Sequence, residues 1–277
     1  MEETQLRTAM SRDVLRRNEI EERYHDEWAK EIDASGLLVP GFFESPTAID
    51  NQYILGQIGS LEGKRILDLG CGVGEAAVYF AMKGANVSGV DISREMLAVA
   101  GRLAERHGVE VDLKKGRTEG LEFDDETFDI VYGYGVLHHI DLALSAKEIQ
   151  RVLKKGGVAF FVEPMGYNPA LWFYRILAKA VRTPVEQPFF FSQLRFFKDF
   201  SSVYHKELWL FSLFAFLNFF FIKRYNPSKV RYWRQVLIEG EECKRWFSVL
   251  KRLDDVVFRF FPPSRYLSST TVIGLRK

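Results

Sequence analysis

The residues best suited to do chemistry lie in a glycine-rich turn and in the apolar segments around it. Three glycines alternate in this turn: Gly70, Gly72 and Gly74. They follow an apolar segment, 66–69, and an acid, Asp91, ends a second apolar segment, 87–90. Glycine lets backbone approach a ligand closely, where a Cβ would prevent it, and a carboxylate at a strand end can accept ribose hydroxyls. The pattern predicts a nucleotide-binding β-α-β unit with a helix over 75–83.

The spacing of the glycines indicates which nucleotide is bound. A dinucleotide site has G-x-G-x-x-G with its third glycine inside the helix, whereas here the spacing is G-x-G-x-G, followed by Glu75. Asp68, in the first strand, would be poorly placed beside a pyrophosphate but well placed beside the ammonium of an amino-acid ligand. These residues resemble motif I of the class I S-adenosylmethionine-dependent methyltransferases, often D-x-G-x-G-x-G. Another Rossmann-like binder is the alternative.

The resemblance continues along the chain. An acidic and aromatic segment, 123–129, precedes the expected fourth strand, residues 136–140 are similar to the family's V-L-H-H signature, and 154–157 lead into the fifth strand. The family fold is an α/β Rossmann-like sheet of seven mostly parallel strands flanked by helices. Its last strand is antiparallel beside the fifth, which suits residues 268–276, and the sixth strand is then expected near 196–208.

The resemblance implies S-adenosyl-L-methionine as cofactor and a set of residues that bind it. They are Tyr24, Asp68, Gly70, Cys71, Gly72, Gly74, Asp91, Ile92, Met96, Arg117, Thr118 and Tyr134. Tyr24 either donates to the cofactor carboxylate or only packs an N-terminal cap onto the core. Arg117 stands where the family often has an aspartate for the adenine amino group, so we expect recognition by neighbouring backbone, by Thr118 or by stacking on Ile92.

Methyl transfer requires a nucleophile aligned behind the sulfonium methyl, and a base helps when the acceptor is a phenol, a carboxyl or an amine. The candidates near the crevice are His138, His139, Glu163, Glu186 and His25. Histidine titrates nearest neutrality, although a histidine at a strand end is often structural and a glutamate before proline can fix a turn. No metal is expected, because Cys71 and Cys243 lack metal-ligand spacing.

Composition favours a single cytoplasmic enzyme. The chain has 277 residues with 38 basic and 37 acidic side chains, so no net positive field favours nucleic acid. The charged N-terminus predicts no secretory signal. We expect a helical cap over 1–59, with apolar positions such as Leu6, Met10 and Val14. The cofactor-binding core is expected over 60–168 and 266–277, and a helical, aromatic-rich insertion over 169–265, which can contain the sixth strand.

One apolar run, 207–223, allows three interpretations. It is shorter than the ~20 residues that cross a bilayer, so it is a helix buried in the insertion, a dimer face, or a surface for peripheral membrane or lipid contact. The sequence therefore predicts a methyltransferase for a small, hydrophobic or aromatic acceptor of natural-product or lipid-like type. The alternative is a non-catalytic sensor or scaffold that binds S-adenosylmethionine and uses the insertion for partner or membrane contact.

Overall fold

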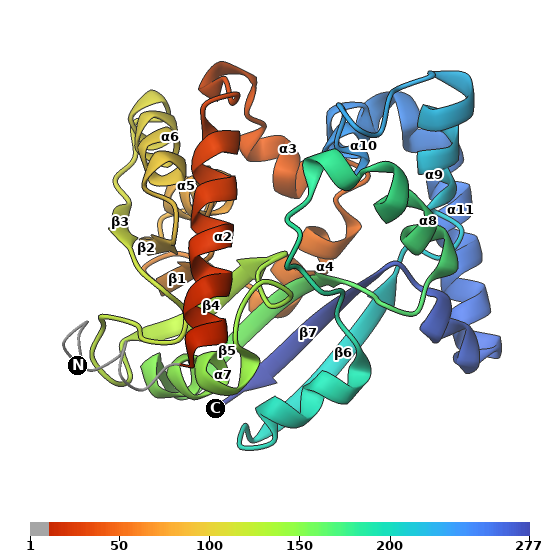
Figure 1. The fold of residues 1–277 in the computed structure, drawn as a ribbon. Helices are drawn as coiled ribbons and strands as arrows, with labels where there is room; N and C mark the ends of the chain where they lie inside the picture. The colour runs from red at the N-terminus through yellow and green to blue at the C-terminus, as the bar shows by residue number, and fades with distance from the viewer. Residues whose placement is uncertain (1–10) are drawn as a thin grey trace.

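A computed structural model describes residues 11–277 and contains a seven-stranded sheet in the order β3-β2-β1-β4-β5-β7-β6 (Figure 1). The strands are β1 Arg65–Leu69, β2 Asn86–Asp91, β3 Asp112–Lys115, β4 Phe128–Tyr134, β5 Leu153–Pro164, β6 Ser202–Leu208 and β7 Thr270–Arg276. β7 lies antiparallel between β5 and β6, and the β1, β2, β3, β4 and β5 pairings are parallel. The predicted fold class, the sixth strand and the antiparallel last strand are confirmed.

Side chains that alternate along the strands build a core on each face of the sheet. Ile66 packs with the helices before and after the glycine turn, whereas Leu67, its neighbour, packs on the opposite face. The helices of the core are α4 Ile49–Ile58, α5 Glu75–Met82, α6 Arg94–Arg106 and α7 Leu142–Val152. Because β1 to β5 are parallel, their carboxyl ends lie together at one edge of the sheet, where open α/β folds bind ligands.

The N-terminal cap crosses this edge as helix α2, Arg12–Ala29, followed by η1, Ala34–Gly36, and α3, Val39–Glu44. Ser11 caps α2 by accepting from the Val14 amide at 3.3 Å. Leu6 and Met10 of the expected cap lie outside the described residues.

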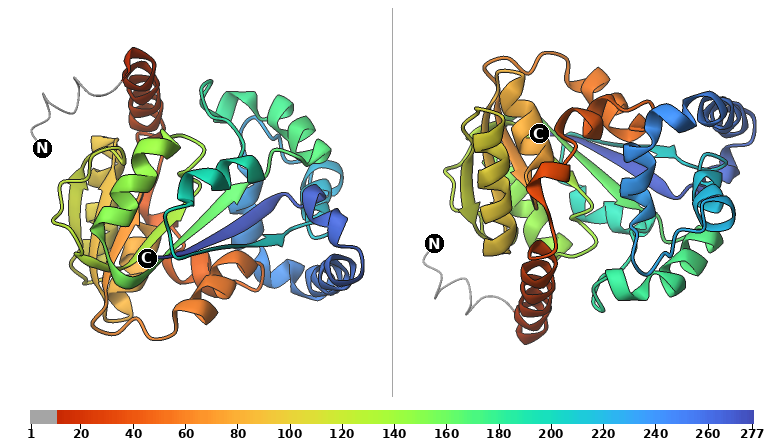
Figure 2. Two further views of the ribbon diagram at one scale, coloured as in Figure 1. Left: turned by 90° about the horizontal axis from the view of Figure 1, so that it is seen from below. Right: turned by 90° about the horizontal axis from the view of Figure 1, so that it is seen from above.

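Segment 169–265 forms a group of elements at the far end of the sheet, beyond β5 (Figure 2). Its elements are α8 Pro169–Leu177, η2 Lys179–Val181, η3 Phe191–Phe197, strand β6, α9 Phe214–Leu217, η4 Asn218–Ile222, α10 Tyr232–Ile238, α11 Gly240–Phe260 and the start of η5, Pro262–Leu267. The division of the chain into cap, core and insertion stays a prediction.

The apolar run 207–223 is not one helix, so the first of its three interpretations, a helix buried in the insertion, is wrong. It begins in β6 and ends as the short α9 and a π-helical turn, η4. Phe219 is fully buried, whereas Phe221 and Ile222 are 67% and 76% exposed. None of the helices described for residues 11–277 combines the length and apolar character needed to span a bilayer.

Candidate functional site

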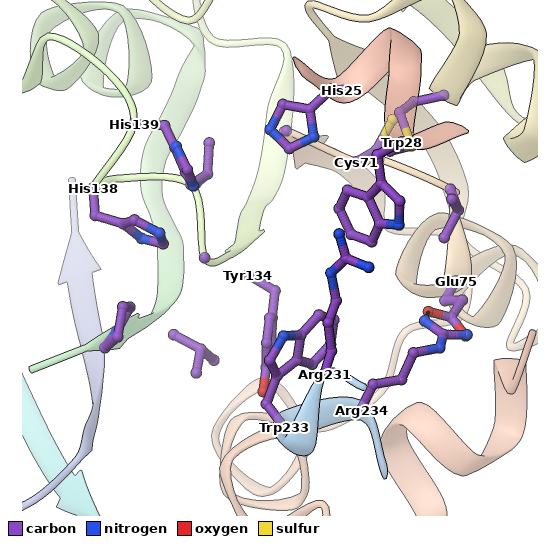
Figure 3. Close-up of a pocket in the computed structure, with 18 of the residues that line it drawn as sticks. His25, Trp28, Cys71, Glu75, Tyr134, His138, His139, Arg231, Trp233 and Arg234 are labelled. Carbon is purple, nitrogen blue, oxygen red and sulfur yellow. Dashed lines mark hydrogen bonds and ion pairs between the residues drawn. The ribbon is translucent and has the colours of Figure 1, made fainter. Parts of the chain in front are cut away.

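A cavity of about 690 Å³ lies at the edge where β1, β2 and β4 end, between α2 and segment 169–265 (Figure 3). Its volume is within the ~300–1,000 Å³ range of ligand pockets. The predicted site residues that line it are Tyr24, His25, Asp68, Gly70, Cys71, Gly72, Asp91, Ile92, Met96, Arg117, Thr118, Tyr134, His138, His139, Glu163 and Glu186. Residues placed far apart in the sequence therefore meet around one space.

The glycine turn brings backbone to the wall of this cavity. Gly70 has φ +69°, and a Cβ there would lie 2.6 Å from Val136 Cγ2. Gly72 has φ +51° and donates its amide to Asp91 Oδ2 at 2.8 Å. Gly74 has a different function: it does not line the cavity, and its missing Cβ, which would lie 2.7 Å from Ala100 Cβ, allows α5 to pack against α6.

Two buried carboxylates mark where a ligand would be held. Asp91 accepts amides from Gly72 and, on its other oxygen, from Ser93 at 2.9 Å, and each oxygen keeps a lone pair for a further donor. Asp68 is 2% exposed, and burial raises its pKa to about 7. Within residues 11–277 its Oδ2 has no hydrogen-bond partner. A buried acceptor without a donor costs free energy, so Asp68 suits a cationic ligand group.

The opposite side of the glycine turn carries the residues expected around adenine. Met96 is 1% exposed, and the Thr118 hydroxyl is hydrogen-bonded to Ser145 Oγ at 2.7 Å. The Thr118 side chain is therefore already engaged, which leaves its backbone, Arg117 and Ile92 to contact an adenine.

Across the cavity, two histidines are each paired with a buried carboxylate. His139 Nδ1 lies 2.9 Å from Glu21 Oε1, which also accepts from the Thr183 hydroxyl at 2.8 Å. His25 Nε2 lies 3.6 Å from the other Glu21 oxygen. Burial by itself would raise the pKa of Glu21, but the hydrogen bonds with His139 and Thr183 and the nearby His25 hold it at about 2. Glu21 is therefore ionised at neutral pH.

The second pair joins His138 to Glu163. Glu163 Oε1 accepts the amides of Val136 and Leu137 at 3.0 and 2.7 Å, and Oε2 lies 2.7 Å from His138 Nδ1. Burial lowers the pKa of His138 well below its usual value and raises the pKa of Glu163 to about 8. The pair holds the turn after β4 in place, and His138 stays neutral at physiological pH.

Glu186 is bound by two arginines. Arg175 lies 3.1 Å from its Oε1, and Arg182 forms an ion pair with the same oxygen. Glu186 therefore serves as the partner of two guanidinium groups.

Several lining residues were missed from the sequence. Glu21 carries a local signal, because it precedes His25 by one helical turn. Trp28, Arg231, Trp233 and Arg234 also line the cavity; the last three come from segment 169–265, more than 150 positions after motif I, so no local pattern reveals them. Arg234 forms two 2.9 Å hydrogen bonds with Glu75, the first residue of α5 (Figure 3).

Known proteins are similar to this chain mainly in its cofactor half. A family model described as a methyltransferase domain matches residues 67–161. A demethylmenaquinone methyltransferase from Chlorobaculum tepidum is 43% identical over 110 residues, which are 38% of this chain and 44% of that protein. A ubiquinone biosynthesis O-methyltransferase from Alkalilimnicola ehrlichii is 34% identical over 175 residues, 60% of this chain and 68% of that protein. The chain thus spans less than half of the first relative and about two thirds of the second.

A solved structure extends the comparison to the rest of the fold. A phosphoethanolamine N-methyltransferase from Haemonchus contortus matches with a TM-score of 0.57 over 92% of this chain and 60% of that chain, at 18% identity, which shows a shared fold. Together with the glycine turn, Asp91 and the sheet order, the sequence matches show that this chain belongs to the family of class I S-adenosylmethionine-dependent methyltransferases, whose methyl donor is S-adenosyl-L-methionine.

Proposed function

We propose that this protein transfers the methyl group of S-adenosylmethionine to a small, hydrophobic or aromatic acceptor. The observation that carries the proposal is that one cavity joins the glycine turn and Asp91 to His139, which is paired with an ionised buried carboxylate, Glu21. A site for the donor and a base for the acceptor thus face the same space.

The residues around the turn fit the cofactor. Asp91 has lone pairs for both ribose hydroxyls, the glycines admit the ligand to the backbone, and the unpartnered Asp68 oxygen suits the methionine ammonium. When bound, the cofactor supplies a methyl group that its sulfonium already activates, so the protein must position the acceptor, exclude water and remove a proton.

His139 is the residue that best suits the role of base. Its Nδ1 hydrogen bond to Glu21 fixes the ring and favours a tautomer with the proton on Nδ1, which leaves Nε2 to take the acceptor proton. The ionised Glu21 then stabilises the imidazolium that forms, as a carboxylate does behind a catalytic histidine. With the cofactor bound, His139 Nε2 would take the proton that the acceptor atom loses on methylation.

His138, Glu163 and Glu186 have other roles in this scheme. Glu163 positions His138 and the turn after β4, because both its oxygens are occupied. A neutral His138 provides a polar wall rather than a base, since its pKa is well below the usual value. Glu186 holds Arg175 and Arg182 at the cavity rim.

The lining of the cavity supports an aromatic or apolar acceptor. Tyr134 and Trp233 have ring centroids 6.2 Å apart, and Tyr174 and Phe216 line the same space. The two relatives are named for demethylmenaquinone and for ubiquinone biosynthesis, which supports a quinone-like aromatic acceptor.

Calorimetry with S-adenosylmethionine, followed by mass spectrometry of metabolite extracts incubated with labelled cofactor, tests the proposal. We expect binding and a labelled, methylated small molecule, with loss of label transfer in His139→Ala. Absence of cofactor binding contradicts the whole proposal. Binding without transfer to any extract favours the non-catalytic sensor instead.

Exposed apolar side chains favour a second property, peripheral contact with a membrane or lipid. Phe221 and Ile222 are exposed at the end of the apolar run. Arg224 lies close by in the sequence, whereas Lys223 is paired with Glu239 and Glu242. A basic residue beside apolar ones favours an anionic lipid surface. Such contact would bring the cavity near an acceptor dissolved in lipid.

A further inference from the structure

Arg231 brings a positive charge to the cavity that no ion pair within residues 11–277 neutralises. Its guanidinium donates to the Tyr24 hydroxyl at 3.3 Å and lies 3.8 Å from the ring centroid of Trp28. Two other arginines that line the cavity are paired: Arg182 with Glu186, and Arg234 with Glu75. Arg117 also lines the cavity without an ion pair among the described residues, but it lies beside Thr118 among the residues expected around adenine. Remaining N–H donors of Arg231 are therefore available to an anionic ligand.

Packing of α10 holds Arg231 where it is. The carbonyls of Val236 and Leu237 accept the hydroxyls of Thr47 and Ser45 at 2.8 and 3.1 Å. Tyr232, next to Arg231, is 1% exposed and packs in the core. Ser45, which lies before α4 (Ile49–Ile58), thereby anchors α10.

Arg231 lies on the side of the cavity where the glycine turn is. Arg234, three residues later, is bonded to Glu75, which begins the helix after that turn. Helix α2, which carries Tyr24 and Trp28, is tied to the end of β2 by the hydrogen bond from Ser93 to Asp26 at 2.6 Å. Figure 3 shows Arg231 reaching under Trp28, with His138 and His139 farther across the cavity.

The amino-acid end of the cofactor carries one charge of each sign. Among the described residues Asp68 offers an unpartnered buried carboxylate oxygen to its ammonium, and a cation nearby would stabilise the corresponding carboxylate. A guanidinium is well suited to this because its planar fork binds a carboxylate with two parallel hydrogen bonds. The Trp28 ring under Arg231 keeps that fork oriented.

We propose that Arg231 binds the carboxylate of the methionine portion of S-adenosylmethionine, so that segment 169–265 completes the cofactor site as well as the acceptor site. The inference rests on the proposed function, since it requires that cofactor to bind. In this arrangement the Tyr24 hydroxyl donates a hydrogen bond to the same carboxylate and accepts one from Arg231. Cofactor binding then draws α2 and the start of α10 together over the ligand.

The test compares S-adenosylmethionine with decarboxylated S-adenosylmethionine, which keeps the ammonium and the adenosine but lacks the carboxylate. Dissociation constants are measured by calorimetry for the wild type, Arg231→Met, Arg231→Lys and the control Arg245→Met. Arg245 is an exposed residue of α11, so its variant removes a guanidinium from the same segment without touching the cavity. Circular dichroism and thermal unfolding show whether each variant is folded.

We expect Arg231→Met to bind S-adenosylmethionine about 30-fold more weakly than the wild type, the scale of a charge-assisted hydrogen-bonded pair. Its affinity for the decarboxylated ligand should equal that of the wild type, which itself should prefer the carboxylated ligand by about 30-fold. Arg231→Lys should retain part of the preference, because it keeps the charge but not the fork. Arg245→Met should behave as the wild type.

Three results would overturn the inference. Equal weakening of both ligands in a folded Arg231→Met would mean that Arg231 only supports Trp28. Unchanged cofactor affinity with a higher KM for the acceptor would assign Arg231 to an anionic acceptor. If the wild type binds both ligands equally well, there is no carboxylate site here. A wild type that binds neither ligand would instead contradict the proposed function itself.

Discussion

Replacing Asp68 by asparagine tests how the buried carboxylate and the cofactor depend on each other. In the free protein burial raises the pKa of Asp68 from 3.8 to about 7, so the group is largely protonated below neutrality. A ligand ammonium favours the ionised carboxylate. Cofactor binding should therefore release a proton from Asp68 at acid pH, and the affinity should fall tenfold for each pH unit below 7.

The expected size of the pH effect on cofactor affinity follows from the pKa of Asp68. Between pH 7 and pH 5 the dissociation constant for S-adenosylmethionine should rise by roughly 50-fold, because about half of Asp68 is already protonated at pH 7. Above pH 8 the affinity should fall again, because an α-ammonium loses its proton near pH ~7.7–8.0. The wild type should bind best between pH 7 and 8. Asp68→Asn should bind more weakly at pH 7.5 and should keep only the alkaline decline, since its side chain does not titrate.

Stability supplies an independent readout without ligand. Because the folded pKa of Asp68 is raised, the folded state binds more protons than the unfolded state between pH 3.8 and about 7, and its contribution to stability falls as pH rises through that window. Above pH 7 the ionised Asp68 lowers the free energy of unfolding by about 4 kcal/mol, at ~1.4 kcal/mol per unit of pKa difference. Urea unfolding of the free protein at pH 8 should therefore show Asp68→Asn to be more stable than the wild type.

Calorimetry from pH 5 to pH 9, in two buffers with different heats of ionisation, measures both the affinity and the protons released. A wild-type affinity that is constant from pH 5 to pH 7 would refute the reasoning. So would an Asp68→Asn protein with the same acid limb as the wild type, because the titrating group would then be another residue.

Three further predictions concern the ribose site, the base and the exposed apolar residues. Asp91→Ala should weaken cofactor binding by about 10- to 100-fold, because the ribose hydroxyls lose a charged acceptor; unchanged affinity in calorimetry would show that Asp91 does not bind the ribose. Glu21→Gln should lower kcat by at least 100-fold with little change in cofactor affinity, and an unaltered pH–rate profile would remove Glu21 from the role of positioning His139. Replacing Phe221 and Ile222 by serine should reduce sedimentation with anionic liposomes, whereas serine at Val249, also exposed, should not; equal binding by both variants would exclude contact through the apolar run.

Local sequence was sufficient for the half of the protein that holds the cofactor. In the turn after β1, Gly70 and Gly72 both have positive φ, a conformation that favours glycine. Because the turn itself sets this backbone conformation, the requirement appears in the sequence as glycine spacing. For the same reason helix 75–83 was predicted within one residue of α5.

The sequence left three interpretations of the apolar run open because hydrophobicity alone does not show which of its side chains are buried. Phe219 faces the core and Ile222 faces solvent, although the two are only three positions apart. Composition reports that such residues are apolar, but burial depends on which neighbours cover them.

The pairing of charges also depended on distant neighbours. Glu21 belongs to the cap, His139 to the turn after β4 and Thr183 to the segment beyond β5, and their hydrogen bonds join positions separated by 118 and 162 residues. The sequence alone indicates the methyl donor, because its binding site depends on the spacing of the glycines and on the residues at the strand ends. Only the tertiary structure shows that His139 has an ionised partner and that Arg231 lines the cavity without an ion pair among the described residues. The reason is that a buried charge acquires its pKa and its partner from groups that the sheet and helices bring together.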